Sequence, residues 1–295
     1  MIKLRVPATS ANMGAGFDTL GVAVGLYNRM MIEEIPEGLE VINKNTQSFI
    51  PQDTSNLIYR AMAELFDYVG YEQKGYRISQ IPMTRGLGSS SACIIGGMLA
   101  ANIISGRQLS YQEIIHLAAK MEGHPDNVGP ALFGGFCVSL MDDDKTIIKS
   151  TKLKSHIKFA VIIPDFFVAT KKSRGVLPSK IDFKDAVFNV GHASMFQAAM
   201  LTCDMKALEI GVKDKLHQQY RKSYVDGMED IFEKTYHLGS HATYLSGSGP
   251  TILSILDGNY DGFKAGMEEY FKTNGLEWKC MILPIDNVGA VVSEI

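Results

Sequence analysis

The sequence predicts an α+β protein built from two domains. Stretches with the alternation of strands and stretches with helical spacing occur in both halves, without the strict strand–helix–strand order of a doubly wound sheet. The length of 295 residues is typical of one large or two ordinary domains, with two favoured. The chain turns polar around residue 150, and we therefore place the domains at residues 1–153 and 154–295.

The first half begins with strand patterns. Apolar residues alternate with basic ones at positions 2–6, which predicts a half-buried strand, and residues 20–35 predict one or two more strands around a glycine-rich bend. Residues 56–69 carry apolar side chains at helical spacing, with Gly70 as a C-cap. Residues 92–104 are small or apolar almost throughout, so we expect a helix that is buried on most sides.

The rest of the chain continues this mixture. Ser110 and Glu113 form a capping box that predicts another helix start, and residues 136–140 predict a strand that ends in a solvated turn at Asp142–Asp144. The second half predicts strands at residues 159–163, 251–256 and 279–283, and helices at residues 186–201, 205–211 and 262–271.

The composition is that of a globular protein with a full core, since hydrophobic residues make up 46% and charged residues 21%. The net charge of −3 gives no support for broad nucleic-acid or anionic-membrane binding, and leaves room for a local basic site. The four cysteines lack the spacing of metal ligands, and scattered thiols fit a reducing compartment. Because neither a signal peptide nor a membrane-spanning apolar run is recognisable, we expect a cytoplasmic protein without membrane contact.

The stretch PMTRGLGSSSA, residues 82–92, has the composition of an anion-binding loop. Gly86 and Gly88 permit backbone conformations in which successive N–H groups point into one concavity. Ser89–Ser91 then begin a helix, whose N-terminal N–H groups favour an anion, and a serine hydroxyl there can reach a magnesium ion. The lysine pattern of P-loop enzymes is absent. Taken alone, an ordinary helix N-cap explains the stretch equally well.

The stretch EGHPDN, residues 122–127, places two carboxylates and an imidazole within five positions. Carboxylates beside a phosphate loop are what Mg²⁺ requires, since it binds one or two of them together with phosphate oxygens. A polar loop with a turn at Pro125–Asn127 is the structural alternative.

Other polar loops carry further candidates. Asn12 and Asp18 lie in PATSANMGAGFD, residues 7–18, where small neighbours would let both side chains face a ligand. Arg174 lies in TKKSR and Arg221 in HQQYR, while SGSGP at residues 246–250 is a second glycine loop. Taken singly, a structural turn, solvated basic loops and a tight strand connection explain these stretches.

Together the loops resemble a known family. PATSANMGAGFD, PMTRGLGSSSA and SGSGP occur in the order of the three motifs of the GHMP kinases. The resemblance is closest to the homoserine kinases, whose pattern is similar to PATSANMGAGFDTLG, EGHPDNVGPALFGGF and TKKSRGVLP, and it spans residues 7 to about 256. It implies a two-domain GHMP kinase fold, with an N-terminal domain like the second domain of ribosomal protein S5, a ferredoxin-like C-terminal domain and an active site between them.

The resemblance implies transfer of the γ-phosphoryl group of ATP to the side-chain hydroxyl of L-homoserine, a step toward threonine. It implies ATP and Mg²⁺, with Ser90, or failing that Ser89, and Glu122 holding the metal. Asn56 and Leu57 match a family position near the adenine. The residues expected to wrap the ATP phosphates are Pro82, Met83, Thr84, Arg85, Gly86, Leu87, Gly88, Ser89, Ser90, Ser91 and Ala92.

Homoserine is a zwitterion, so its recognition follows from charge. Its carboxylate is expected on Arg174 and Arg221, because planar guanidinium groups suit carboxylates. Its ammonium group is expected on Asp18 and on the side-chain carbonyl of Asn12. The resemblance further implies that His124 and Asp126 lie near the reacting hydroxyl, with Thr170 nearby, and it leaves open whether Asp126 acts as a base.

Two other functions stay open from the sequence. A GHMP kinase for another substrate, such as mevalonate, would be little affected by Arg174→Ala or Arg221→Ala. A catalytically inactive relative that senses a ligand would be expected to have lost Glu122, Asp126 or the loop glycines, all of which are present. A nucleic-acid role, suggested by the S5-like domain, conflicts with the acidic balance. The expected partners are therefore small-molecule substrates, with a homodimer as the expected assembly.

Overall fold

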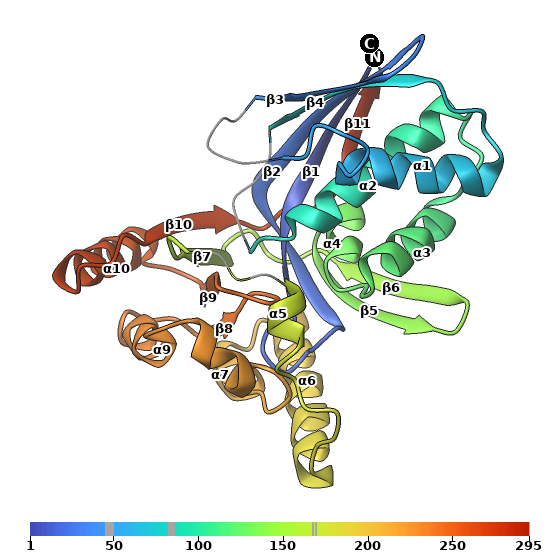
Figure 1. Cartoon of the computed structure of the whole chain (residues 1–295). Coiled ribbons are helices and arrows are strands. Elements are labelled where there is room, and N and C mark those ends of the chain that lie inside the picture. The colour runs from blue at the N-terminus through green and yellow to red at the C-terminus, as the bar shows by residue number, and fades with distance from the viewer. Residues whose placement is uncertain (45–49, 82–85, 167, 169, 295) are drawn as a thin grey trace.

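The computed structural model of the chain describes residues 1–44, 50–81, 86–166, 168 and 170–294, without the side chains of residues 170 and 171. The described residues form two sheets with helices packed on them (Figure 1). None of the helices within these ranges is long and apolar enough to cross a membrane.

Seven strands form the first sheet. They are β1 (Ile2–Ala11), β2 (Leu20–Ile35), β3 (Leu39–Asn43), β4 (Gly75–Ile81), β5 (Phe136–Asp142), β6 (Lys145–Thr151) and β11 (Val291–Glu294). The main path runs in the order β11-β1-β2-β4-β3, and β5 pairs with both β2 and β6. All these pairs are antiparallel except β3 with β4.

Helices cover one face of this sheet and leave the other face open (Figure 1). They are α1 (Leu57–Val69), α2 (Ser89–Ile104), α3 (Tyr111–Glu122) and α4 (Val128–Phe133). α2 is buried from Ser91 to Asn102, as its composition predicts. It packs closely on α1 at Gly97, since the absence of a side chain there lets the two backbones approach. A Cβ on Gly97 would lie only 2.5 Å from the carbonyl oxygen of Ile58.

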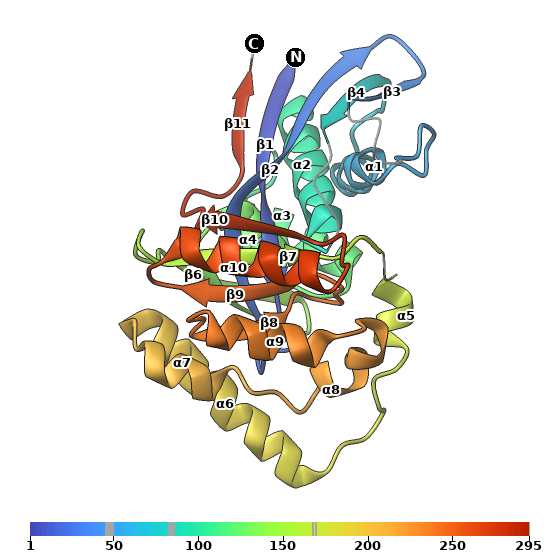
Figure 2. The same cartoon turned by 90° about the vertical axis from the view of Figure 1, so that its left-hand side faces the viewer.

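The second sheet has four antiparallel strands in the order β10-β7-β9-β8. Its strands are β7 (Lys158–Ile163), β8 (Ala242–Leu245), β9 (Ile252–Leu256) and β10 (Lys279–Pro284). Its helices are α5 (Thr170–Arg174), α6 (Phe183–Thr202), α7 (Met205–Gly211), α8 (Gln218–Arg221), α9 (Met228–His237) and α10 (Tyr260–Thr273), with a 3₁₀ turn at Lys222–Tyr224. Figure 2 shows α9 and α10 lying on the outer face of the sheet.

One apolar core joins the two sheets. Phe159 and Val161 of β7 belong to the same buried cluster as Val6 of β1. The alternate residues Ala160 and Ile162 face a second cluster beneath α9 and α10. Because the strand alternates its side chains between the two clusters, the second sheet is packed on both faces. The position of one domain on the other is therefore set by shared core packing.

The structure also differs in part from the sequence-based expectations. Residues 20–35 form a single strand, and the bend is a break in register, since Pro7 pairs with Tyr27 while Ala8 pairs with Val24. The strand β11, which the expected boundary assigns to the second domain, pairs with β1 of the first. The domain limits at residues 153 and 154 therefore stay a prediction.

Candidate active site

The described part of the phosphate loop, Gly86–Ala92, leads directly into α2; Pro82, Met83, Thr84 and Arg85 lie outside the described residues. Gly86 and Gly88 have φ values of 73° and 65°, in the left-handed region that favours glycine. A Cβ on Gly88 would also lie 1.9 Å from Thr9 Oγ1. Among the described residues no side chain caps α2. The N–H groups of its first turn are therefore suited to an anion.

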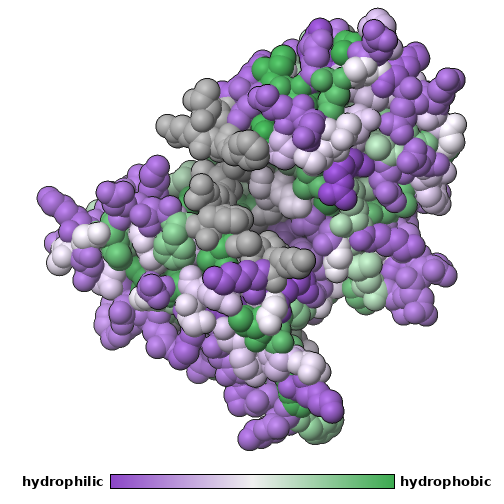
Figure 3. Space-filling view, in the orientation of Figure 1, coloured by the Kyte–Doolittle hydropathy of each residue, from purple (hydrophilic) through white to green (hydrophobic). Residues whose placement is uncertain are grey.

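Hydrogen bonds join this loop to the other two glycine-rich stretches. Leu87 O accepts a hydrogen bond of 3.1 Å from Thr9 N, and Gly86 O accepts one of 3.0 Å from Ser246 Oγ. The hydroxyl oxygens of Ser246 and Ser10 are 2.8 Å apart. The three sequence motifs therefore meet at one place, between the first and second sheets. Figure 3 shows the surface hollowed between these two parts of the molecule, with hydrophilic residues beside the hollow.

Glu122 lies at the C-terminus of α3, against the N-terminus of α2. Its two carboxylate oxygens accept hydrogen bonds from Ser90 Oγ at 2.8 Å and from Ser91 Oγ at 3.0 Å. Ser90 is exposed, whereas Ser91 is fully buried. The structure therefore brings Glu122 together with Ser90, and Ser91 adds a second hydroxyl to the same carboxylate. The expected role of Ser90, or failing that Ser89, and Glu122 at a metal stays a prediction.

In the loop after α3, the side chains of His124 and Asp126 form a hydrogen bond. Their Nδ1 and Oδ1 atoms are 2.6 Å apart, and Asp126 is only 1% exposed. Burial alone would lower the pKa of His124, but the hydrogen bond and charge of Asp126 outweigh it and hold the pKa above the ordinary value. Gly21 permits this arrangement, because a Cβ there would lie 1.8 Å from the carbonyl oxygen of Asp126.

Asp18 completes a polar group with these two residues. One ligand-type atom each of Asp18, His124 and Asp126 lie within 4.8 Å of one another. Asp18 also receives two hydrogen bonds from Arg174, at 2.6 and 3.0 Å. This ion pair outweighs the effect of burial and raises the pKa of Arg174. The residues expected to bind the two charged groups of the substrate thus bind each other in the structure.

Asn12 holds the loop that carries Asp18. Its side-chain oxygen accepts a hydrogen bond from Asp18 N at 3.0 Å, and its Nδ2 donates to Gly247 O at the same distance. Asn12 and Asp18 both have positive φ values, of 69° and 53°. The side-chain carbonyl that the sequence assigned to the substrate ammonium is therefore used to shape the loop.

Arg221 is a cation buried to 2% exposure. It donates to Gly247 O at 2.8 Å and to Ser173 O at 3.2 Å, and it has no ion pair within the described ranges. Burial and the neighbouring charge of Arg174 lower its pKa to about 10. A buried guanidinium whose partners are neutral carbonyl groups is well suited to receive a carboxylate.

Phe17 lies between the two arginines. The guanidinium carbons of Arg174 and Arg221 lie 5.5 and 5.4 Å from the centre of its ring. These distances are within the range of cation–π contacts. The aromatic ring of Phe17 therefore contacts both cations.

His217 supports Arg221 from the same helical turn. Its Nε2 lies 2.9 Å from Gly14 O and its Nδ1 lies 3.3 Å from Arg221 Nη1, so the neutral ring donates to the carbonyl and accepts from the arginine. Burial lowers the pKa of His217, which keeps it neutral. The sequence analysis did not assign this residue, although the spacing of His217 and Arg221 by four positions was a usable signal.

Three expected site residues have structural roles or limited description. Asn56 caps α1, accepting from Ile58 N at 3.0 Å and from Tyr59 N at 3.3 Å, and Leu57 is the first residue of that helix. Thr170 begins α5, and its side chain lies outside the described part. The adenine role of Asn56 and Leu57 and the substrate role of Thr170 stay predictions.

Thr9 and Asn127 also belong to the site, and the sequence analysis assigned neither. Thr9 Oγ1 donates to Asn127 Oδ1 at 2.8 Å in a fully enclosed position. This bond connects β1 to the loop that carries Asp126. A threonine and an asparagine 118 positions apart give no sequence signal that they meet.

Comparison with known proteins defines the class of protein. Residues 56–135 match the sequence model described as the N-terminal domain of GHMP kinases. The chain is 45% identical to a homoserine kinase from Clostridium beijerinckii, covering 100% of this chain and 99% of that one. It is 44% identical to a homoserine kinase from Caldicellulosiruptor saccharolyticus, covering 100% and 97%.

Solved structures agree in fold. A homoserine kinase from Cytophaga hutchinsonii superposes with a TM-score of 0.88 at 24% identity, covering 99% of this chain and 97% of that one. A putative homoserine kinase from Listeria monocytogenes has a TM-score of 0.80 at 28% identity and full coverage of both chains. The fold is that of GHMP kinases, which transfer phosphoryl groups from ATP, and the glycine-rich loop Gly86–Ala92 lies within the residues that match their N-terminal domain. Within this class, the chain belongs to the homoserine kinase family.

Proposed function

We propose that this chain transfers the γ-phosphoryl group of Mg-ATP to the side-chain hydroxyl of L-homoserine, giving O-phospho-L-homoserine for threonine biosynthesis. The observation that carries this proposal is the site's division into two ends. An anion-binding helix start at Gly86–Ala92 lies at one end, and charges of both signs lie at the other, on Asp18, Arg174 and Arg221. A nucleotide needs the first end, and an amino-acid zwitterion needs the second.

Homoserine would bind by replacing one ion pair with three. Asp18 and Arg174 neutralise each other in the structure. A zwitterion can separate them by offering its ammonium group to Asp18 and its carboxylate to Arg174 and to the buried Arg221. A neutral sugar or a simple carboxylate offers only part of this exchange. The buried charge of Arg221 in particular favours a substrate with a carboxylate.

The residues at the other end fit a magnesium ion. Ser90 Oγ and the Glu122 carboxylate are already 2.8 Å apart, and both are the hard oxygen ligands that Mg²⁺ prefers beside phosphate. The group of Asp18, His124 and Asp126 fits less well, since it includes a nitrogen ligand and its carboxylates already bind Arg174 and His124. We propose that Ser90 and Glu122 hold the ion, which would neutralise charge on the phosphates.

In the reaction, the homoserine hydroxyl oxygen forms a bond to the γ-phosphorus while the bond to the ADP oxygen breaks, and the hydroxyl loses its proton. Phosphoryl transfer of this kind depends mainly on positioning and charge neutralisation. Asp126 is held by His124 and is shielded from water, so we propose that the pair orients the hydroxyl. The proton-accepting role of Asp126 is tested separately below.

The direct test measures ADP release with Mg-ATP and, separately, homoserine, mevalonate, galactose and phosphomevalonate. We expect turnover on homoserine far above that on the other three substrates. Arg174→Ala and Arg221→Ala should each reduce turnover on homoserine, while the control Arg77→Ala, whose side chain is half-buried and paired with Glu33 and Glu40, should not. Turnover on any of the others without turnover on homoserine would refute the assignment.

We further propose a cytoplasmic homodimer. The four cysteines are free, which suits a reducing compartment. On α6, Phe183 is 85% exposed and Val190 is 68% exposed, and Val187 between them is also exposed, which suits a surface covered by a second copy. Light scattering should give twice the monomer mass, and Val190→Lys should shift it to the monomer. A monomer at working concentrations would contradict the proposed homodimer and would leave the proposed activity unaffected.

A further inference from the structure

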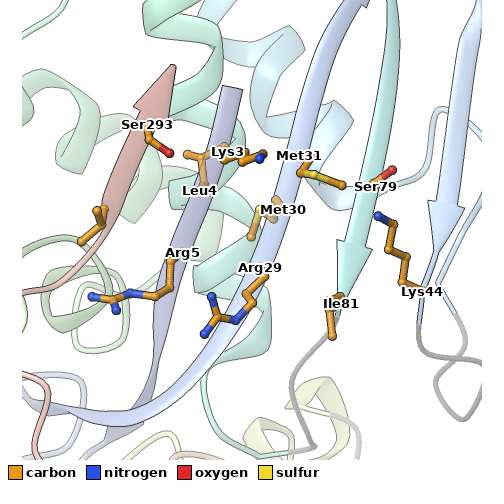
Figure 4. Close-up of a pocket in the computed structure, with 11 residues that line it drawn as sticks. Lys3, Leu4, Arg5, Arg29, Met30, Met31, Lys44, Ser79, Ile81 and Ser293 are labelled. Carbon is orange, nitrogen blue, oxygen red and sulfur yellow. The ribbon is translucent and has the colours of Figure 1, made fainter. Parts of the chain in front are cut away.

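The face of the first sheet that the helices leave open contains a cavity of about 470 Å³. Figure 4 shows its lining residues on neighbouring strands, with the helices behind the sheet. The register aligns them in two rows, because Ser293, Lys3, Met31 and Ser79 are successive partners across β11, β1, β2 and β4. None of the lining residues belongs to the site proposed for ATP and homoserine.

Four cations line this cavity, and its described lining includes no acidic residue. They are Lys3, Arg5, Arg29 and Lys44. Arg5 and Arg29 are direct partners on adjacent strands, so two like charges stand opposite each other. Such pairs are unfavourable in a sheet unless a counter-charge lies between or above them. Among the described residues, none of the four takes part in an ion pair.

The guanidinium of Arg5 has a hydrogen-bond donor without an acceptor among the described residues. Its Nε is buried and has no hydrogen-bond partner within the described structure. The guanidinium carbon lies 4.5 Å from the centre of the Tyr27 ring, and that of Arg29 lies 5.9 Å from the same ring. An aromatic face attracts a cation but accepts no conventional hydrogen bond from it. A buried donor of this kind is costly until a ligand accepts from it.

The nearby carboxylate of Asp286 is already engaged. Its Oδ2 accepts from Tyr27 Oη at 2.9 Å, and its Oδ1 accepts from Val288 N and Gly289 N at 2.8 and 2.7 Å. It therefore positions the Tyr27 ring beneath the arginines and forms no ion pair with either. The positive charge of the cavity is left for an external partner.

The cavity also has an apolar part. Met31, Ile81 and Val291 line it beside the cations, and Ile81 and Val291 are 42% and 39% exposed. A simple inorganic anion would leave this surface in water. A ligand that combines an anionic group with an apolar body would cover it and gain from both.

We propose that this cavity is a second ligand site, which binds a small organic anion carrying phosphate or carboxylate groups on an apolar body. The anionic group lies against Arg5 and Arg29, with Lys3 and Lys44 at the rim. The apolar body lies on Met31, Ile81 and Val291. We expect this site to be separate from the proposed nucleotide site, with which it shares no lining residue.

The test uses 8-anilinonaphthalene-1-sulfonate, a fluorescent anion with an apolar body, and the full chain with saturating ATP and no Mg²⁺. We expect saturable binding at one site, weakened by added salt because the charges are partly exposed. Arg5→Gln and Arg29→Gln should each weaken it at least about tenfold, since each removes charge-assisted hydrogen bonds. Arg77→Gln is the matched control, because Arg77 is on the same sheet with its charge paired to Glu33 and Glu40.

Unchanged homoserine-dependent ADP release would show that the variants are folded; Arg29 is exposed, so its variant is the safer of the two. Displacement of the dye by inorganic phosphate or by citrate supports the site and tells which anionic group it prefers. The proposal is overturned if Arg29→Gln binds the dye like the wild type, if ATP displaces the dye, or if neither anion does.

Discussion

Arg174 donates two hydrogen bonds to the carboxylate of Asp18, joining α5 of the second domain to the loop after β1. The side chains of the two residues are 37% and 32% exposed, so the pair contributes little to stability, about 0–1 kcal/mol. Its position beside Arg221 and Asp126 points instead to a role in holding the substrate charges. The first prediction follows from this contrast.

Arg174→Ala should raise the KM for homoserine about tenfold to a hundredfold, because a hydrogen bond to a charged group contributes about 1.5–3 kcal/mol. The melting temperature should change little, since the ion pair is partly exposed. Steady-state kinetics and thermal unfolding of the same preparation measure both effects. A large loss of stability with an unchanged KM would assign Arg174 to the fold and not to the substrate.

Asp126→Asn should lower kcat about a hundredfold or more while leaving the KM for ATP nearly unchanged, because the residue lies at the acceptor end of the site. The pH dependence of kcat separates its two possible roles. If Asp126 accepts the hydroxyl proton, the acidic limb of the profile disappears in the variant, and if it only positions the hydroxyl, that limb stays. A kcat equal to that of the wild type would exclude both.

Glu122→Gln should lower turnover most strongly when magnesium is limiting. The amide can still accept from one serine, so the fold should be kept, but it loses the negative charge that suits a divalent cation. Turnover measured against free Mg²⁺ should show a higher magnesium requirement, and Ser91→Ala serves as a control that removes a neighbouring hydrogen bond without removing charge. Unchanged turnover at limiting magnesium would rule out the metal role.

The stability contributed by His124 should depend on pH. Its pKa in the folded protein lies above the ordinary value of 6.5, because its partnership with Asp126 outweighs burial. A raised pKa contributes stability that is fully present below pH 6.5 and is lost as the pH rises through the folded value. The wild type should therefore lose its stability advantage over His124→Gln as the pH rises above 6.5 and through the folded-state pKa. A difference in unfolding free energy that does not vary with pH would contradict this.

Gly88→Ala should impair both folding and nucleotide binding. The left-handed backbone costs about 1–2 kcal/mol for a residue with a side chain. At Gly88 the added methyl also meets Thr9 Oγ1 at 1.9 Å. Gly70→Ala is the matched control, because Gly70 has a similar φ of 69° and no atom within 4 Å of its Cβ position. Denaturant unfolding should show a larger loss of unfolding free energy for Gly88→Ala than for Gly70→Ala. Equal losses would contradict the expected clash with Thr9 Oγ1.

Elements with strong local signals were predicted well. The helix expected at residues 56–69 is observed as Leu57–Val69, capped at its start by the side chain of Asn56 and at its end by Gly70 in the left-handed conformation that glycine favours. The helix at residues 205–211 has the expected bounds, and the exposed turn expected at the three aspartates is formed by Asp143 and Asp144, while Asp142 ends β5. The strand β4 was missed, because polar residues such as Arg77 and Gln80 interrupt its apolar pattern and are stabilised by partners elsewhere in the fold.

The candidate site likewise has features that the sequence predicts and features that only the structure shows. The sequence by itself determined the family and marked Gly86–Ala92 and Glu122–Asn127 as candidate site stretches, because these features depend on short runs of residues whose backbone and chemistry are local. Only the tertiary structure decided that Asp18 binds Arg174, 156 positions away, and that Arg221 is buried on His217. It also decided that Arg5 and Arg29 stand side by side over Tyr27. Such pairings arise from strand register and from the shared core of the two domains, and neither is encoded in any short stretch of the chain.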